Sequence, residues 1–138
     1  MSGDCIFCKI VAGDIPSRSV YEDKQVLAFM DIMPMVKGHT LVIPKAHYES
    51  LEDTPAEVLE RVIRVVQRVA KAQTRGLGAE GVRIVQSNGA AAGQVVPHIH
   101  FHVVPRFGND GVPRGWEQKR YDNDDEMDGY AAKIEAAL

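Results

Sequence analysis

Three histidines and three apolar residues alternate without interruption in the stretch PHIHFHVVP, residues 97–105. The histidines are His98, His100 and His102, and the apolar residues that follow each of them are Ile99, Phe101 and Val103. Because side chains of a β-strand point alternately to opposite faces, this pattern predicts a strand with all three imidazoles on one face. The apolar face then belongs to the core, so the chain must contain a sheet that is covered on the side opposite the histidines.

The same spacing limits what the histidine row can bind. At a rise of about 3.3 Å per residue, His98 and His102 are roughly 13 Å apart along a strand. A zinc ion holds each ligand atom at about 2 Å, so at most two neighbouring histidines could share one ion. The row therefore predicts at least one imidazole that is available for proton transfer or nucleophilic attack near neutral pH.

Other short stretches have the composition of strands. Residues 19–31, SVYEDKQVLAFMD, indicate two strands joined by a polar turn around Asp23 and Lys24. Residues 39–44, HTLVIP, and residues 81–87, GVRIVQS, indicate one strand each. With the histidine stretch they predict five strands, and the loop of small residues before the last one favours antiparallel pairing.

Two helices complete the predicted elements. The longer one is expected from an N-cap at Thr54, a first-turn Pro55 and a capping-box Glu57, and it should end at Gly76. Its apolar residues keep helical spacing: Val58, Leu59, Val62, Ile63, Val66, Val69 and Ala70. A weaker amphipathic helix near the C-terminus has one face formed by Met127, Tyr130, Ala131, Ile134 and Leu138. This set of elements predicts an α+β fold.

Composition limits the size, location and partners of the protein. At 138 residues, 45% of them apolar, the chain suits a single domain, residues 1–138, whose core needs no disulfides. A net charge of -3 with scattered Lys and Arg gives no basic patch, which argues against a nucleic-acid partner. No apolar run has the length of a membrane span, and the N-terminus lacks the regions of a signal peptide. We therefore expect a cytoplasmic protein with no membrane partner.

Both cysteines, Cys5 and Cys8, belong to one C-x-x-C motif. In a reducing compartment such a pair indicates a metal or redox site rather than a structural disulfide. A thioredoxin-like redox pair normally follows a strand, but only four residues precede Cys5, which favours zinc. A closed tetrahedral site needs two further ligands, and outside the row the chain offers His39 and His47. Incidental buried thiols are the alternative.

Taken together, these residues resemble the histidine triad family, whose motif His-φ-His-φ-His-φ-φ, with φ apolar, is matched at residues 98–104. The resemblance extends upstream through residues 5–47 and 85–98, so it covers residues 5–106. It implies an α+β fold on a five-stranded antiparallel sheet, in a homodimer whose two sheets run together. It also implies hydrolysis or transfer of purine nucleotides at the α-phosphate.

The resemblance implies a different role for each histidine. His100 matches the nucleophile that attacks the α-phosphorus, and His102 matches the residue that contacts the phosphate oxygens, where a protonated imidazole stabilises developing charge. In members with a C-x-x-C, the resemblance implies a structural zinc ion held by Cys5, Cys8, His47 and His98. His39 is then expected beside the site, as a partner of a residue that contacts the substrate.

Further positions match the nucleotide contacts of the family. Asp31 matches the acid that binds both ribose hydroxyls, although a turn former is the alternative interpretation. Asn88, Gly93 and Gln94 match residues that bind the phosphate and the reacting region, and Phe7, Phe29 and Ile32 match the apolar clamp on the base, or else belong to the core.

Two features depart from the Hint branch of the family. Val95 stands where that branch often has a serine that assists the leaving group, which puts efficient phosphoramidate cleavage in doubt. The C-terminal extension, residues 107–138, replaces a short Trp-containing C-terminus, so leaving-group preference is open.

Two functions remain. The first is an enzyme that acts on nucleoside phosphoramidates or dinucleoside polyphosphates through a nucleotidyl-histidine. The second is a zinc-stabilised nucleotide-binding or scaffolding protein. The intact His100, His102, Asn88 and Gln94 favour the enzyme, because binding alone does not require a placed nucleophile.

Overall fold

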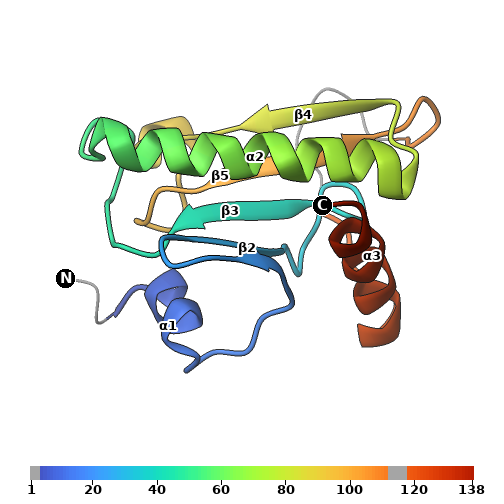
Figure 1. Ribbon diagram of the computed structural model, residues 1–138, viewed down its shortest axis with the longest axis horizontal. Helices are drawn as coiled ribbons and strands as arrows, with labels where there is room; N and C mark the ends of the chain where they lie inside the picture. The colour runs from blue at the N-terminus through green and yellow to red at the C-terminus, as the bar shows by residue number, and fades with distance from the viewer. Residues whose placement is uncertain (1–3, 112–117) are drawn as a thin grey trace.

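A computed structural model describes residues 4–111 and 118–138 and confirms the α+β class. The strands are β1 (Ser19–Glu22), β2 (Val26–Met30), β3 (Thr40–Pro44), β4 (Gly81–Val85) and β5 (Phe101–Arg106). They form one sheet in the order β1-β2-β3-β5-β4, and every neighbouring pair is antiparallel. The helices are α1 (Ile6–Ala12), α2 (Ala56–Leu77) and α3 (Asp124–Ala137). Figure 1 shows α2 running along the sheet and α3 at the end of the molecule opposite α1.

The sheet is covered on both faces, whereas the sequence predicted a core only opposite the histidines. On one face, Ala28 and Val42 pack with the apolar stripe of α2 and with Ile134 of α3. On the other face, Phe29 and Leu41 pack under α1. His102 pairs with Leu41 across β3 and β5, and paired residues of antiparallel strands share a face. The histidine row therefore lies on the α1 side and is itself partly buried.

The predicted β-strand at residues 98–105 is too long at its start. β5 begins at Phe101, so His98 and His100 lie in the irregular segment that leads into it. In that segment the His98 N–H donates to Val96 O, and the Ile99 N–H donates to Tyr48 O instead of joining the sheet ladder. These local bonds replace those of a strand, and the His98 side chain in this segment lies with Nδ1 3.4 Å from Sγ of Cys5.

The predicted ends of α2 are also wrong. The helix begins after Pro55 without a side-chain cap, because the Thr54 hydroxyl donates to the Ser50 carbonyl at 2.7 Å. It ends at Leu77, with Gly78 as a left-handed C-cap (φ 70°), rather than at Gly76. Gly76 lies inside the helix where α3 crosses it, and a Cβ there would be 2.4 Å from Lys133 O.

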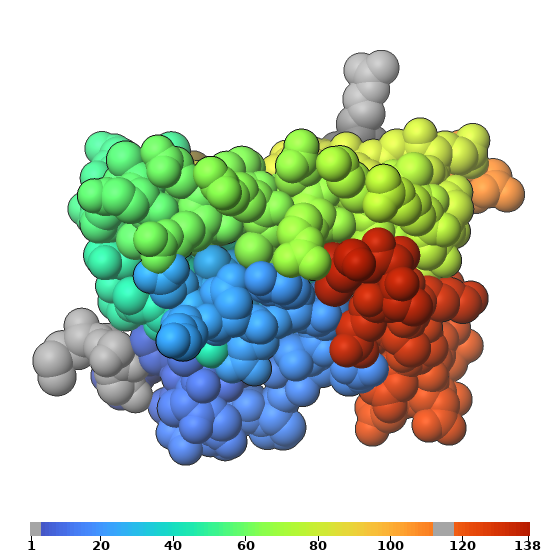
Figure 2. Space-filling model, viewed as in Figure 1, coloured from blue at the N-terminus to red at the C-terminus, as the bar shows by residue number. Residues whose placement is uncertain are grey.

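The C-terminal helix is confirmed, and it joins the main core. Ala131 and Ile134 are fully buried in the cluster beneath α2, and Asn123 caps the start of α3 by accepting from the Glu126 N–H. Arg18, just before β1, forms an ion pair with Glu135 of α3 at 2.8 Å. Figure 2 shows this helix, in red, against the green surface of α2.

The sequence analysis missed two short helices, α1 and the one-turn 3₁₀ helix η2 (Ala90–Ala92). Cys5 is the N-cap of α1, and its sulfur accepts a hydrogen bond from the Cys8 N–H at 3.4 Å. Gly13, with φ of 83°, ends the helix in the left-handed conformation. The C-x-x-C motif therefore opens a helix after all, although no described strand precedes it. Among the described residues, no helix combines the length and the apolar character that crossing a membrane requires.

Candidate functional site

His100 is held by the backbone in one tautomer. Its Nδ1 lies 2.7 Å from the carbonyl oxygen of His98, and a carbonyl can only accept, so the ring proton is on Nδ1. The other nitrogen, Nε2, then carries the lone pair. Burial lowers the pKa of His100 below its ordinary value, so the ring is neutral near pH 7. This is the state that a nucleophilic imidazole requires.

Phe7 packs beside this ring, and Phe29 packs against Phe7. The Phe7 ring meets His100 edge to face at 5.1 Å and Phe29 at 5.5 Å, and both phenylalanines are buried, Phe7 on α1 and Phe29 on β2. The core interpretation of these two residues is thus confirmed, and it leaves their proposed contact with a base as a prediction. Ile32, the third member of the predicted clamp, is 71% exposed in the loop after β2.

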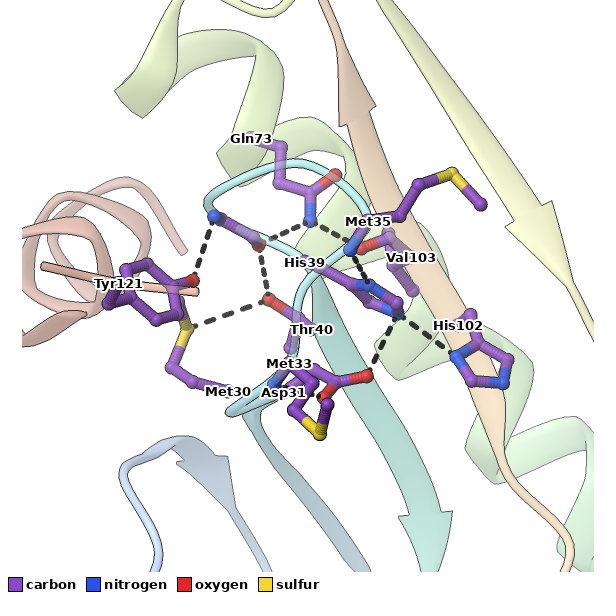
Figure 3. A network of polar contacts seen from close by, with 11 residues as sticks. Met30, Asp31, Met33, Met35, His39, Thr40, Gln73, His102, Val103 and Tyr121 are labelled. Carbon is purple, nitrogen blue, oxygen red and sulfur yellow. Dashed lines mark hydrogen bonds and ion pairs between the residues drawn. The ribbon is translucent and has the colours of Figure 1, made fainter. Parts of the chain in front are cut away.

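His39 is fully buried between Asp31 and His102 (Figure 3). The Met35 N–H donates to its Nδ1 at 3.0 Å, so its own proton is on Nε2. That nitrogen lies 3.0 Å from Nδ1 of His102 and 3.5 Å from Oδ2 of Asp31. Burial, with His102 and His100 nearby, lowers the pKa of His39 to about 3, so the ring is neutral. His39 is therefore a donor toward His102.

This contact decides the tautomer of His102. Because Nδ1 of His102 accepts from His39, the neutral His102 ring must carry its proton on Nε2. Burial and the neighbouring His100 lower the pKa of His102 to about 4. In the protein without substrate, His102 is thus a neutral imidazole with an N–H at Nε2, rather than the protonated imidazole that the resemblance suggested. Its ring centroid is 4.9 Å from that of His100.

Asp31 follows β2 and has the contacts of a turn residue, which is one of the two interpretations that the sequence left open; ribose binding stays a prediction. As a turn residue, it accepts the Met33 N–H on Oδ1 at 2.9 Å, and its own N–H donates to His39 O. As a site residue, it directs Oδ2 toward His39. Burial raises the pKa of Asp31 to about 6, partly offset by the Met33 hydrogen bond. A carboxylate that is this poorly solvated gains strongly from new hydrogen-bond donors.

The four predicted zinc ligands lie together at the N-terminus of α1. Cys5, Cys8, His47 and His98 each contribute one ligand atom, and these atoms all lie within 4.8 Å of one another. Nδ1 of His98 is 3.4 Å from Sγ of Cys5 and 3.5 Å from Sγ of Cys8, and Nδ1 of His47 is 3.3 Å from Sγ of Cys8. In a tetrahedral zinc site, a sulfur and a nitrogen ligand lie about 3.5 Å apart. The cluster therefore has the spacing that a zinc ion needs.

The tautomer of His98 also fits a metal. Its Nε2 donates to the Pro44 carbonyl at 2.8 Å, which leaves the lone pair on Nδ1, the atom that faces both cysteines. Burial and the neighbouring Cys5 raise the pKa of Cys8 to about 11, so this thiol needs an adjacent cation to ionise.

The side-chain amides of Asn88 and Gln94 hold their loop to the backbone of residues 49–51. Asn88 Oδ1 accepts from the Leu51 N–H at 2.7 Å, and Gln94 Nε2 donates to Glu49 O at 2.6 Å. Gly93 has a φ of 94°, which only glycine adopts readily. Val95 is 89% exposed in the same loop. A role of these amides in phosphate binding remains a prediction, because their present partners belong to the protein.

Gln73 and Tyr121 are site residues that the sequence analysis did not single out. Both bond to Gly38, the residue before His39. A signal for Gln73 was present, since it is a polar residue four positions after Val69 on the apolar stripe of α2. Nothing in the sequence pointed to Tyr121.

The fold and the histidine row together define a class of small α+β proteins. The sequence matches the HIT domain family over residues 12–109, so the chain belongs to the HIT domain family. An uncharacterized HIT-like protein of Methanocaldococcus jannaschii is 48% identical over 122 residues, covering 88% of this chain and 94% of the relative. An adenosine 5'-monophosphoramidase of Schizosaccharomyces pombe is 42% identical, covering 81% of this chain and 82% of the relative. An adenylylsulfatase of Arabidopsis thaliana is 40% identical, covering 80% of this chain and 56% of the relative.

Solved structures of the same class agree along nearly the whole chain. A zinc-bound histidine triad family protein of Mycobacterium smegmatis superposes with a TM-score of 0.85 at 41% identity, covering 97% of this chain and 95% of that one. A HIT-like protein of Bartonella henselae gives a TM-score of 0.87 at 42% identity, covering 100% of this chain and 98% of that one.

Proposed function

We propose that this protein hydrolyses or transfers purine nucleotides at the α-phosphate through a covalent nucleotidyl-histidine on His100. The observation that carries the proposal is the 2.7 Å hydrogen bond from Nδ1 of His100 to the His98 carbonyl, which leaves the Nε2 lone pair for attack. The relatives named as an adenylylsulfatase and a monophosphoramidase support it, because both names describe cleavage beside the phosphorus of an adenylyl group.

The reaction has two displacements at phosphorus. Nε2 of His100 attacks the α-phosphorus, the bond to the leaving group breaks, and its electron pair departs with that group. Water then attacks the same phosphorus and gives up one proton to the solvent, the nitrogen–phosphorus bond breaks, and the lone pair returns to Nε2 as the nucleoside monophosphate is released. The Nε2–H of His102 donates to a phosphate oxygen during both steps, which stabilises the charge that develops there.

The remaining contacts position the nucleotide. Asp31 accepts hydrogen bonds from the ribose hydroxyls, which returns to its buried carboxylate the solvation it lacks in the protein alone. The amides of Asn88 and Gln94, with the backbone of Gly93, bind phosphate oxygens after exchanging their present loop partners. The base lies against the apolar side chains of Phe7, Phe29 and Ile32.

A structural zinc ion belongs to the same proposal. Cys5, Cys8, His47 and His98 would hold it, and four protein ligands leave no position for substrate. When bound, the ion supplies only rigidity. His98 would then be held in place as a ligand, and its carbonyl accepts from Nδ1 of His100 and so orients that ring.

The direct test compares four substrates. Purified protein is incubated with an adenosine phosphoramidate, a guanosine phosphoramidate, a dinucleoside polyphosphate and adenylyl sulfate, and release of nucleoside monophosphate is measured by chromatography. We expect turnover of at least one substrate, and its loss in the His100→Ala protein together with retained nucleotide binding. Binding of nucleoside monophosphate without turnover of any substrate would instead support the nucleotide-binding or scaffolding protein.

A further inference from the structure

Gly38, the residue before His39, is contacted by helix α2, by strand β5 and by the segment that precedes α3. Its φ is +103°, and a Cβ there would lie 2.7 Å from Leu77 of α2 and 3.0 Å from Pro105 of β5. Its N–H donates to the Tyr121 hydroxyl at 3.0 Å, and its carbonyl accepts from Gln73 Nε2 at 3.1 Å (Figure 3). The peptide groups on both sides of Gly38 are thus fixed by side chains that are distant in sequence.

Gln73 connects the two segments that carry the histidine pair. The same Nε2 that donates to Gly38 O, one residue before His39, also donates to Val103 O at 2.8 Å, one residue after His102. The side chain is fully buried on the apolar stripe of α2, and its Oε1 finds no hydrogen-bond partner in the part of the chain that the structure describes. A buried amide with an unpaired oxygen is unfavourable for folding, so an apolar residue of similar size would serve the core as well.

Tyr121 brings the C-terminal extension into this arrangement. It lies just before α3, its ring packs 5.9 Å from the Tyr130 ring, and its hydroxyl accepts from the backbone next to His39. Through Tyr121, the described part of the C-terminal extension contacts the residue next to His39 from within the same chain.

We propose that Gln73 and Tyr121 are positioning residues, which hold Gly38 so that His39 keeps His102 in the tautomer with its proton on Nε2. The hydrogen bond from His39 to His102 is 3.0 Å long, and His39 follows Gly38 directly. A rotation of the Gly38 peptide moves the His39 ring, breaks this bond and lets the His102 proton occupy either nitrogen. The effect on turnover, though not the effect on the tautomer, rests on the proposed function.

The tautomer can be read without any substrate. In ¹⁵N-labelled protein, long-range ¹H–¹⁵N correlations distinguish a protonated from an unprotonated imidazole nitrogen. We expect His102 to give one tautomer in the wild type and a mixture of both in Tyr121→Phe and in Gln73→Met. The matched controls are Tyr130→Phe and the exposed Gln67→Met, which should match the wild type. An unchanged His102 signal in both Tyr121→Phe and Gln73→Met would overturn the proposal.

Kinetics test the same claim at the level of the reaction. Tyr121→Phe and Gln73→Met should lower kcat by about tenfold or more while KM changes by less than about twofold, because the ring that donates to the phosphate is misplaced. The thermal unfolding temperature checks that each variant is folded. In a His39→Asn background, where the amide can still accept the Met35 N–H but Nε2 is absent, Tyr121→Phe should cause almost no further loss.

The outcomes separate the two proposals. A loss from Tyr121→Phe that is equally large with and without His39 would show that Tyr121 acts by another route, and would overturn the inference. If the wild type turns over no nucleotide, the proposed function fails, and the His102 signal alone decides whether Gln73 and Tyr121 position the ring.

Discussion

At the scale of single residues, the site depends on which nitrogen of each imidazole carries the proton. In three rings a hydrogen bond to the backbone determines the protonated nitrogen. The partners are Pro44 O for His98, His98 O for His100 and the Met35 N–H for His39. In His102, the hydrogen bond from His39 determines the protonated nitrogen. Each ring thereby has one lone pair and one N–H in fixed places, and the proposed function gives each a different role: metal ligand, nucleophile, donor to its neighbour, or donor to the phosphate.

Asp31→Asn should yield a more stable but less active protein. The folded-state pKa of Asp31, about 6, lies above its unfolded value, so the folded state binds the proton more tightly. Asp31 therefore favours folding at low pH, and this contribution is lost as pH rises through about 4 to 6. At neutral pH, Asp31→Asn should raise the free energy of unfolding by on the order of 1–3 kcal/mol, because the buried charge is removed while Met33 keeps an acceptor.

Urea unfolding at several pH values measures this effect. The difference between wild type and Asp31→Asn should disappear below about pH 4, where the wild-type carboxyl is protonated in both states. Nucleotide turnover should fall, because an amide oxygen accepts less strongly than a carboxylate. A variant less stable than the wild type at neutral pH would show that the Asp31 charge stabilises the fold.

At the scale of elements, the strands and the two long helices could be predicted from periodicity, and the parts that serve the site could not. β1 to β4 lie within the predicted stretches, which are short, contain β-branched or aromatic residues and are separated by polar turns or by the long helix. The start of β5 differs because the His98 and Ile99 N–H groups donate to the carbonyls of Val96 and Tyr48 instead of to a neighbouring strand. Helix α1 was missed because seven residues are too few to show a period.

Gly76→Ala should destabilise the protein, against the usual gain from replacing a helical glycine. The added Cβ would lie 2.4 Å from Lys133 O, so α2 and α3 must separate, at a cost of about 1–3 kcal/mol. Gly129 in α3 is the matched control, since a Cβ there meets nothing within 4 Å. Gly129→Ala should stabilise by about 0.5–1 kcal/mol, and thermal unfolding of the two variants compares the signs directly. Equal stabilisation by both would show that α2 and α3 do not pack as described.

Helix α1 should depend on metal. We expect elemental analysis to find about one zinc ion per chain, reduced in Cys5→Ser, with a lower unfolding temperature, because binding of the ion is coupled to folding of the ligands. Lys9→Ala, on the same helix but not a ligand, should keep the zinc. Metal-free protein as stable as the purified wild type would rule out the structural role.

At the scale of the whole molecule, the two edges of the sheet differ in how they are covered: α3 packs against the β1 edge, and the β4 edge exposes an apolar side chain. Strand β1 lies at one edge beside α3, and β4 lies at the other with Ile84 44% exposed. On α2, Ile63 is 50% exposed. An apolar strand at a sheet edge is a template for pairing with a second chain. We therefore propose that two copies pair through β4 and continue one sheet, as the resemblance implies.

Light scattering tests this assembly. The wild type should give the mass of a homodimer at micromolar concentration, and Ile84→Asp should shift it toward the monomer. Leu51→Asp, which places a charge on another exposed apolar residue, should leave the mass unchanged. A monomeric wild type would refute the assembly and confine the site to residues of one chain.

The covalent step on His100 is the central claim, and the stereochemistry at phosphorus tests it most directly. A substrate with a chiral α-phosphorothioate is hydrolysed in ¹⁸O-labelled water, and the configuration of the product is determined. Two successive displacements, first by Nε2 of His100 and then by water, predict overall retention of configuration. Inversion would mean that water attacks the phosphorus directly, and would contradict the mechanism.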